Sequence, residues 1–270
     1  MDDIMKQVSE LFSIVLNDYY SYFQLKPVDV EIILAEKNEN IYRKKRLDLF
    51  EGENDMHFED DTEERGLTIP PRTRDGKFTI VINKNYLFES IRKQDWQWVG
   101  TLTHEMTHVI DFINYAKMND LNNFDVVQKA FIHRPFMLWT EFHAKATGYF
   151  FIRKFVFREK CNDKSDRGQT DYILNKELPF QINSYLQRYE AANGNINIQL
   201  YETMQFMGRY FVWETLFPNI FNEVKRQQVF GSNPWMIDMY EFLFEHKDIQ
   251  SANGDFDCMQ DIIKINFGEF

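Results

Sequence analysis

The stretch from Gln97 to Ile113 constrains the fold of this chain more than any other. Its apolar residues recur at steps of three and four positions with no proline among them, which predicts a helix with a buried face. The pattern His-Glu-x-x-His, formed by His104, Glu105 and His108, lies within this stretch. The sequence therefore predicts that two histidines and a glutamate project from a largely buried helix.

This spacing suits a metal site that carries out hydrolysis. Residues four apart project from the same face of a helix, so His104 and His108 can bind one metal ion. Glu105 lies one position further round and can face the coordination position that these ligands leave open. In hydrolytic zinc sites the metal lowers the pKa of water, and a carboxylate accepts the proton as the water attacks a carbonyl group. The motif therefore predicts a Zn²⁺ site with Glu105 as general base.

The motif helix is one ligand short, because catalytic zinc usually takes three protein ligands. Asp111 is one candidate, either as a ligand or as a residue that orients a histidine. Glu141 and His143 are the others, on a predicted helix that runs from Pro135 to about residue 158, and residues two apart on a helix cannot both face the metal. Two small residues on the face of Glu141 would let the helices pack closely, which favours Glu141: Ala144 and Gly148.

The order of a predicted strand at 78–83, the motif helix and a second helix bearing Glu141 resembles the zincin metallopeptidases over residues 70–155. Within that group it is similar to the gluzincins, in which a glutamate from a downstream helix completes the site. The resemblance implies that His104, His108 and Glu141 bind zinc, that Glu105 is the base, and that the substrate is a peptide or protein.

Two subgroups of zincins fit less well. Asn114 stands where the extended metzincin motif has its third histidine, and Asp111 stands where that motif has glycine. Lys145 occupies the position, four residues after the glutamate ligand, at which a thermolysin-like second helix carries aspartate. The resemblance is therefore to the gluzincin arrangement of ligands rather than to these two subgroups.

A peptidase also needs a group that stabilises the oxyanion and a place for the substrate to dock. Three residues near the second helix are candidates for the stabiliser, namely His133, Tyr149 and Arg153. The strand at 78–83 is a possible sheet edge on which an extended peptide could add a strand.

The predicted fold class is α+β and predominantly helical, with a small twisted sheet packed on the motif helix and a helical C-terminal region. Alternating and β-branched apolar residues predict strands at 28–34 and 78–83. A charged run at 159–169 is the best linker candidate, so we expect a zincin-like catalytic domain at 1–158 and a helical region at 159–270, which can also be part of the same domain. The acidic stretch 51–64 is expected to be a surface loop. Further helices are expected at 2–23, 124–131, 172–190, 200–217 and 234–246.

Composition excludes several classes of protein. A net charge of −11 argues against a nucleic-acid partner, since phosphate binding needs clustered lysine and arginine. No apolar run is long enough to cross a membrane, and no secretory leader precedes the first helix. Two distant cysteines suit a reducing compartment, so a cytoplasmic protein is expected.

The leading hypothesis is a zinc metallopeptidase. The alternative is an inactive zincin-fold binding or regulatory protein, against which the intact Glu105 argues. The oligomeric state is open.

Overall fold

The computed structural model describes residues 2–45, 65–159 and 166–268. This part of the chain is predominantly helical with one small sheet, which confirms the predicted α+β class. The predicted acidic loop at 51–64 and most of the predicted linker lie outside the described residues. Among the described residues, none of the helices combines the length and the apolar character that a membrane crossing requires.

The sheet has three strands in the order β1-β3-β2. Strand β3 (Phe78–Asn83) pairs in parallel with β1 (Val30–Ala35) and antiparallel with β2 (Gly66–Ile69). Every residue of β3 is buried, as expected for a central strand. The prediction that 78–83 forms a sheet edge is therefore wrong, because both of its sides are paired. Strand β2, which the sequence did not reveal, is an edge strand.

Helix α4 (Gln97–Met118) contains the His-Glu-x-x-His motif and packs against the sheet. Its apolar residues Leu102, Met106 and Val109 are fully buried, in agreement with the predicted apolar periodicity. Three other elements of the N-terminal half surround this layer: α1 (Asp2–Tyr22), α2 (Asn38–Lys45) and α3 (Lys84–Lys93).

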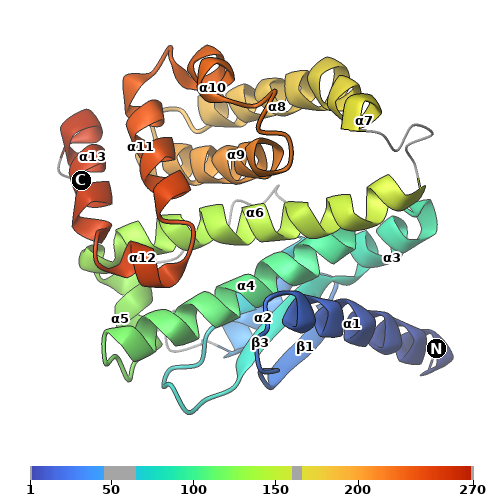
Figure 1. Ribbon diagram of the computed structural model, residues 1–270. Helices are drawn as coiled ribbons and strands as arrows, with labels where there is room; N and C mark the ends of the chain where they lie inside the picture. The colour runs from blue at the N-terminus through green and yellow to red at the C-terminus, as the bar shows by residue number, and fades with distance from the viewer. Residues whose placement is uncertain (1, 46–64, 160–165, 269–270) are drawn as a thin grey trace.

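Helix α6 (Arg134–Glu159) occupies the centre of the molecule, between α4 on one side and the C-terminal helices on the other (Figure 1). Glycines permit close packing on both sides. A Cβ atom on Gly148 would lie 2.5 Å from the backbone oxygen of Gly100 on α4. On the other side of α6, a Cβ atom on Gly208 of the C-terminal region would lie 2.6 Å from the backbone oxygen of Phe142. The predicted close packing of the two site helices at Gly148 is therefore confirmed.

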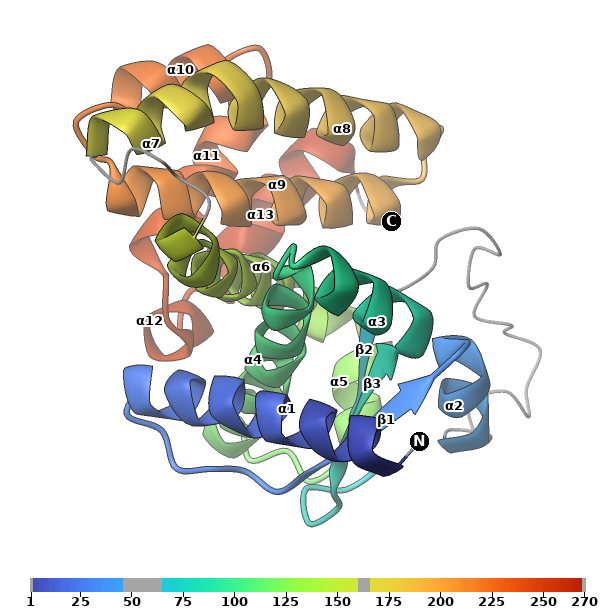
Figure 2. The same cartoon turned by 90° about the vertical axis from the view of Figure 1, so that its right-hand side faces the viewer.

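The helices from α7 to α11, between residues 166 and 245, form the layer on the far side of α6 (Figure 2), whereas α12 packs against α4. One hydrophobic core extends from Val8 on α1 to Ile263 on the last helix. Helices α6 and α9 run in the same direction, since Arg134 bonds to Asn197 near their starts and, further along both helices, Trp213 bonds to Tyr149. The remaining elements are α5 (Phe124–Lys129), a 3-10 turn (Phe131–His133), α7 (Asp166–Tyr172), a π-helical turn (Ile173–Glu177), α8 (Leu178–Ala191), α9 (Ile196–Leu216), α10 (Glu223–Phe230), α11 (Pro234–Glu245), α12 (Ile249–Asn253) and α13 (Phe256–Phe267).

Candidate metal centre

Three potential metal ligands meet where α4 faces α6. The Nε2 atoms of His104 and His108 lie 3.0 Å apart. A carboxylate oxygen of Glu141 lies 3.5 Å from Nε2 of His108, and the other lies 3.8 Å from Nε2 of His104. Each of the three residues thus offers one atom to a common point, and the group could hold a metal ion.

The spacing fits a small tetrahedral ion. Zinc bonds of about 2.0–2.1 Å place the ligand atoms of a tetrahedral site about 3.3 Å apart. The separation of 3.0 Å between the two Nε2 atoms and that of 3.5 Å between Nε2 of His108 and Oε1 of Glu141 lie on either side of that value. The separation of 3.8 Å from Nε2 of His104 is to the other oxygen, Oε2. Two imidazoles and one carboxylate are also the donor types that zinc takes in catalytic sites with an open position. The residues present therefore fit the predicted ion, and three protein ligands leave one tetrahedral position for a further group.

Hydrogen bonds fix the orientation of His108. Its Nδ1 atom lies 3.0 Å from the hydroxyl oxygen of Thr140, and that hydroxyl donates its proton to Asp111 over 2.8 Å. Because the single hydroxyl proton is directed at Asp111, the oxygen accepts from Nδ1–H of the histidine. The Nε2 atom of His108 then carries a lone pair that points toward His104, which is the form of imidazole that binds a metal.

His104 is also set up as a neutral ligand. Burial, followed by the charges of His108 and Lys145, holds the pKa of His104 well below its ordinary value, while a bond to the backbone of Ala144 acts in the opposite direction. A neutral imidazole keeps its lone pair for a cation. The two histidines therefore present adjacent lone pairs, and such an arrangement is stabilised by a positive ion between them.

The other two candidate ligands lie beside this centre rather than in it. Nδ1 of His143 lies 3.0 Å from both carboxylate oxygens of Asp111, and its ring stacks on Trp139. Burial opposes the charged form of His143, but the charge and hydrogen bond of Asp111 outweigh it and raise the pKa. Asp111 thus orients Thr140 and binds His143. The structure brings Glu141, rather than His143 or Asp111, to the motif histidines.

The proposed base, Glu105, faces the sheet edge. It is buried, and one of its carboxylate oxygens accepts a hydrogen bond of 2.8 Å from the hydroxyl of Thr68 on β2. The other carboxylate oxygen would lie only 2.7 Å from a Cβ atom placed on Gly66, so only glycine at this position leaves room for it. Sequence reasoning missed both β2 residues, because a four-residue strand that begins with glycine gives little periodicity.

Gln205 is a further residue that the sequence did not single out. Its amide donates to Glu141 over 2.8 Å from helix α9, and Gln205 itself is buried. The contact joins residues 64 positions apart in the chain. No local pattern could have indicated it, since the pairing depends on how α9 packs against α6.

The three candidate stabilisers have other partners. The Tyr149 hydroxyl accepts hydrogen bonds from Trp213 and Arg153 and donates to Glu177. Arg153 is 4% exposed and forms an ion pair of 3.0 Å with Glu177. His133, in the 3-10 turn before α6, bonds to the hydroxyl of Tyr115 on α4. The structure does not bring these three residues into the group formed by the metal-ligand candidates. Their role in stabilising an oxyanion stays a prediction.

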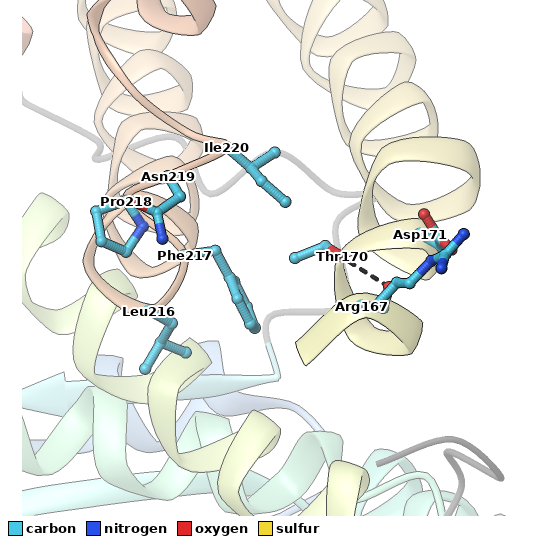
Figure 3. Close-up of a pocket in the computed structure, with 8 residues that line it drawn as sticks. All are labelled: Arg167, Thr170, Asp171, Leu216, Phe217, Pro218, Asn219 and Ile220. Atoms are coloured by element: carbon cyan, nitrogen blue, oxygen red, sulfur yellow. Dashed lines mark hydrogen bonds between the residues drawn. The ribbon is translucent and has the colours of Figure 1, made fainter. Parts of the chain in front are cut away.

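A pocket lies between α7 and the end of α9 (Figure 3). Its walls come from α7, from the last residue of α9 and from the chain that follows it, and a hydrogen bond joins the hydroxyl of Thr170 to the backbone oxygen of Arg167. None of the predicted site residues lines it. The lining residues are Arg167, Thr170, Asp171, Leu216, Phe217, Pro218, Asn219 and Ile220.

Comparison of the chain with models of protein families, with curated proteins and with solved structures found no match. The chemistry of the centre is therefore inferred from its residues and their geometry.

Proposed function

We propose that this chain is a zinc-dependent peptidase with His104, His108 and Glu141 as ligands and Glu105 as general base. The observation that carries the proposal is the position of Glu105. It belongs to the same helical turn as the two histidines, yet its carboxylate is held against β2 and apart from the ligand group. A carboxylate beside the ligands, rather than among them, suits proton transfer.

When bound, zinc supplies Lewis-acid chemistry: it acidifies water and polarises a carbonyl group. The protein's own residues provide the rest. The carboxylate of Glu105 accepts a proton from the attacking water and passes it to the leaving amine. Thr68 holds this carboxylate in place through a hydrogen bond, and the Thr140–Asp111 pair keeps His108 in the tautomer that binds metal.

Strand β2 supports a peptide as the substrate. It is an edge strand of the sheet, and its residues Gly66 and Thr68 contact Glu105. An extended peptide that added itself to this edge would pass beside the base, with its backbone aligned by hydrogen bonds to the strand. The docking strand in this proposal is β2. The sequence had suggested β3 instead.

The substitution Glu105→Gln tests the function. It keeps the size of the side chain and an acceptor for Thr68 but removes the basic oxygen. Cleavage of a broad peptide library should fall by about 10²–10⁴-fold, while zinc content and melting temperature stay close to those of the wild type. Glu89→Gln, on the exposed surface of α3, is the matched control and should keep full activity.

Elemental analysis after mild purification tests the metal. We expect about one zinc per chain, because three ligands surround one point, and a clear loss in His104→Ala. Equal metal in both proteins would contradict the assigned ligands. If wild type and Glu105→Gln both bind zinc and a common protein partner, yet neither cleaves any peptide, the protein is instead a binding protein on a zincin scaffold.

A further inference from the structure

Cationic side chains gather beside the candidate metal centre, although the chain carries a net charge of −11. They come from the residue before β2 and from helices α6, α8 and α9. Burial is the largest cause that lowers the pKa of Lys145, and the positive charges of three arginines come next. The charge of Glu141 acts in the opposite direction. The members of this cationic cluster are Arg65, Lys145, Arg188 and Arg209.

Two members lie directly beyond Glu141. Lys145 follows Glu141 by one helical turn and shares its face of α6. On α9, Arg209 follows Gln205 by one turn, and Gln205 bonds to Glu141. The parallel helices come so close here that a Cβ atom on Gly208 would lie 2.9 Å from Cβ of Lys145. Lys145 and Arg209 are therefore neighbours, one turn along from the metal ligand.

Three members of the cationic cluster lack a carboxylate partner. Within the described part of the chain, no ion pair to a carboxylate includes Lys145, Arg209 or Arg65. The guanidinium of Arg209 donates to the neutral side chain of Gln181. That of Arg65 lies over the ring of Tyr86, 5.1 Å from its centroid. A cation that loses water without gaining an anion is costly, so an anionic group that entered here would be stabilised.

The nearest carboxylates are already engaged. Glu202 forms an ion pair of 2.6 Å with Arg188, and Glu177 forms one of 3.0 Å with Arg153. Glu141 is directed at the motif histidines and would share its charge with a metal ion. Metal binding would therefore make this region still more positive, which increases the attraction for an anion from outside.

We propose that Lys145 and Arg209, flanked by Arg65 and Arg188, bind a carboxylate group of the peptide substrate beside the metal centre. This inference rests on the proposed peptidase function. The carboxylate can belong to an acidic side chain or to the C-terminus of the peptide, and both offer the two oxygens that a guanidinium binds in parallel. Lys145 and Arg209 are thus specificity residues.

Equilibrium binding of three matched probes to the full-length chain tests the proposal: acetyl-Ala-Gln-Ala-amide, acetyl-Ala-Glu-Ala-amide and acetyl-Ala-Gln-Ala with a free carboxylate. At least one of the two anionic probes should bind about tenfold more tightly than the neutral one at low ionic strength, and the preference should shrink with added salt. The anionic probe that binds more tightly shows whether the bound carboxylate belongs to an acidic side chain or to the C-terminus of the peptide.

The titrations are made with zinc-loaded and with zinc-free protein, because a carboxylate can also bind zinc directly. The preference should persist in the zinc-free protein and disappear in Lys145→Gln and Arg209→Gln. Arg92→Gln removes the same charge from the exposed end of α3 and serves as the control, with the preference kept. Melting curves establish that each variant is folded. If Lys145→Gln does not fold, Arg209→Gln alone decides.

Equal affinity for the three probes would overturn the proposal, as would an equal loss of preference in Arg92→Gln. A preference that exists only with zinc bound would assign the carboxylate to the metal instead. If Lys145→Gln lowers kcat equally for charged and neutral peptides without changing probe binding, the residue stabilises the transition state and the proposal fails. Failure of the peptidase function is distinguishable, since it abolishes cleavage and leaves probe binding by the cluster unchanged.

Discussion

The hydroxyl group of Thr68 lies 2.8 Å from a carboxylate oxygen of Glu105 and 3.0 Å from the backbone oxygen of the same residue. One side chain on the sheet edge thus contacts both the proposed base and the backbone of the motif helix. A base that takes a proton from water must keep its position to within a fraction of an ångström. The contact supplies that constraint, and it ties the base to the strand along which a peptide would lie.

Gly66→Ala should impair catalysis without loss of metal. The added methyl group would lie 2.7 Å from a carboxylate oxygen of Glu105 and 2.6 Å from Cγ2 of Thr101, so the base must move. We expect kcat/KM to fall by about 10–100-fold while zinc content stays unchanged. Gly254→Ala is the control, because nothing lies within 4 Å of the atom it adds. Unchanged activity in Gly66→Ala would show that the position of Glu105 against β2 is unimportant.

Removal of Glu141 should weaken zinc binding far more than removal of His143. Only Glu141 lies with the two histidines, whereas His143 bonds to Asp111 and stacks on Trp139. Competition titrations with a chelator on Glu141→Ala and His143→Ala measure the difference. A larger loss in His143→Ala would transfer the role of third ligand to that residue, and the gluzincin-like assignment would be abandoned.

Thr140→Val should lower zinc affinity by about 10–100-fold, since it removes the group that orients His108. It also leaves buried hydrogen-bonding atoms of His108 and Asp111 without this partner, so the free energy of unfolding should fall by about 1–3 kcal/mol. Thr203→Val, which removes a buried hydroxyl on α9, is the control: it can lower stability but should keep zinc affinity. Equal zinc affinity in both variants would contradict the orienting role.

Gly148→Ala should destabilise the fold. Its methyl group would lie 2.5 Å from the backbone oxygen of Gly100, and a backbone atom cannot move aside as a flexible side chain can. Separation of α4 and α6 should cost about 1–3 kcal/mol in the free energy of unfolding, which chemical denaturation measures. Zinc affinity should fall as well, because His104 and Glu141 lie on the two helices that separate. A variant as stable as wild type would show that the helices are not in such close contact.

Much of the fold could be predicted from periodicity. The motif helix, α1, α6 and the strands β1 and β3 all follow repeats of apolar residues that the sequence displays directly. The expected contact of Gly148 with the motif helix followed from small residues on one helical face, and the same argument favoured Glu141. The predictions of these elements, of the glycine contact and of the place of Glu141 beside the two histidines agree with the structure because they depend on local spacing and on a few residues within one helix.

The missed elements have weak local signals. Strand β2 has four residues, and helix α3 (Lys84–Lys93) begins directly after β3 at Asn83, so strand and helix patterns merge there. The contacts of Gln205 and Arg209 with the site region could not be foreseen either, because they depend on the packing of α9 along α6. The position of β3 at the centre of the sheet likewise depends on β2, whose absence from the prediction made 78–83 look like an edge.

The hydrogen bond from Gln205 to Glu141 has a consequence for coordination number. The amide holds oxygen Oε2 of the carboxylate, which lies 3.8 Å from Nε2 of His104, whereas Oε1 lies 3.5 Å from Nε2 of His108. A cation bound here would compete with the amide for Oε2, so Glu141 would bind it through Oε1 in preference. One-oxygen binding by Glu141 would leave a position open at a small ion. A helix that contributes no ligand atom would in this way influence how many ligand atoms the centre can offer.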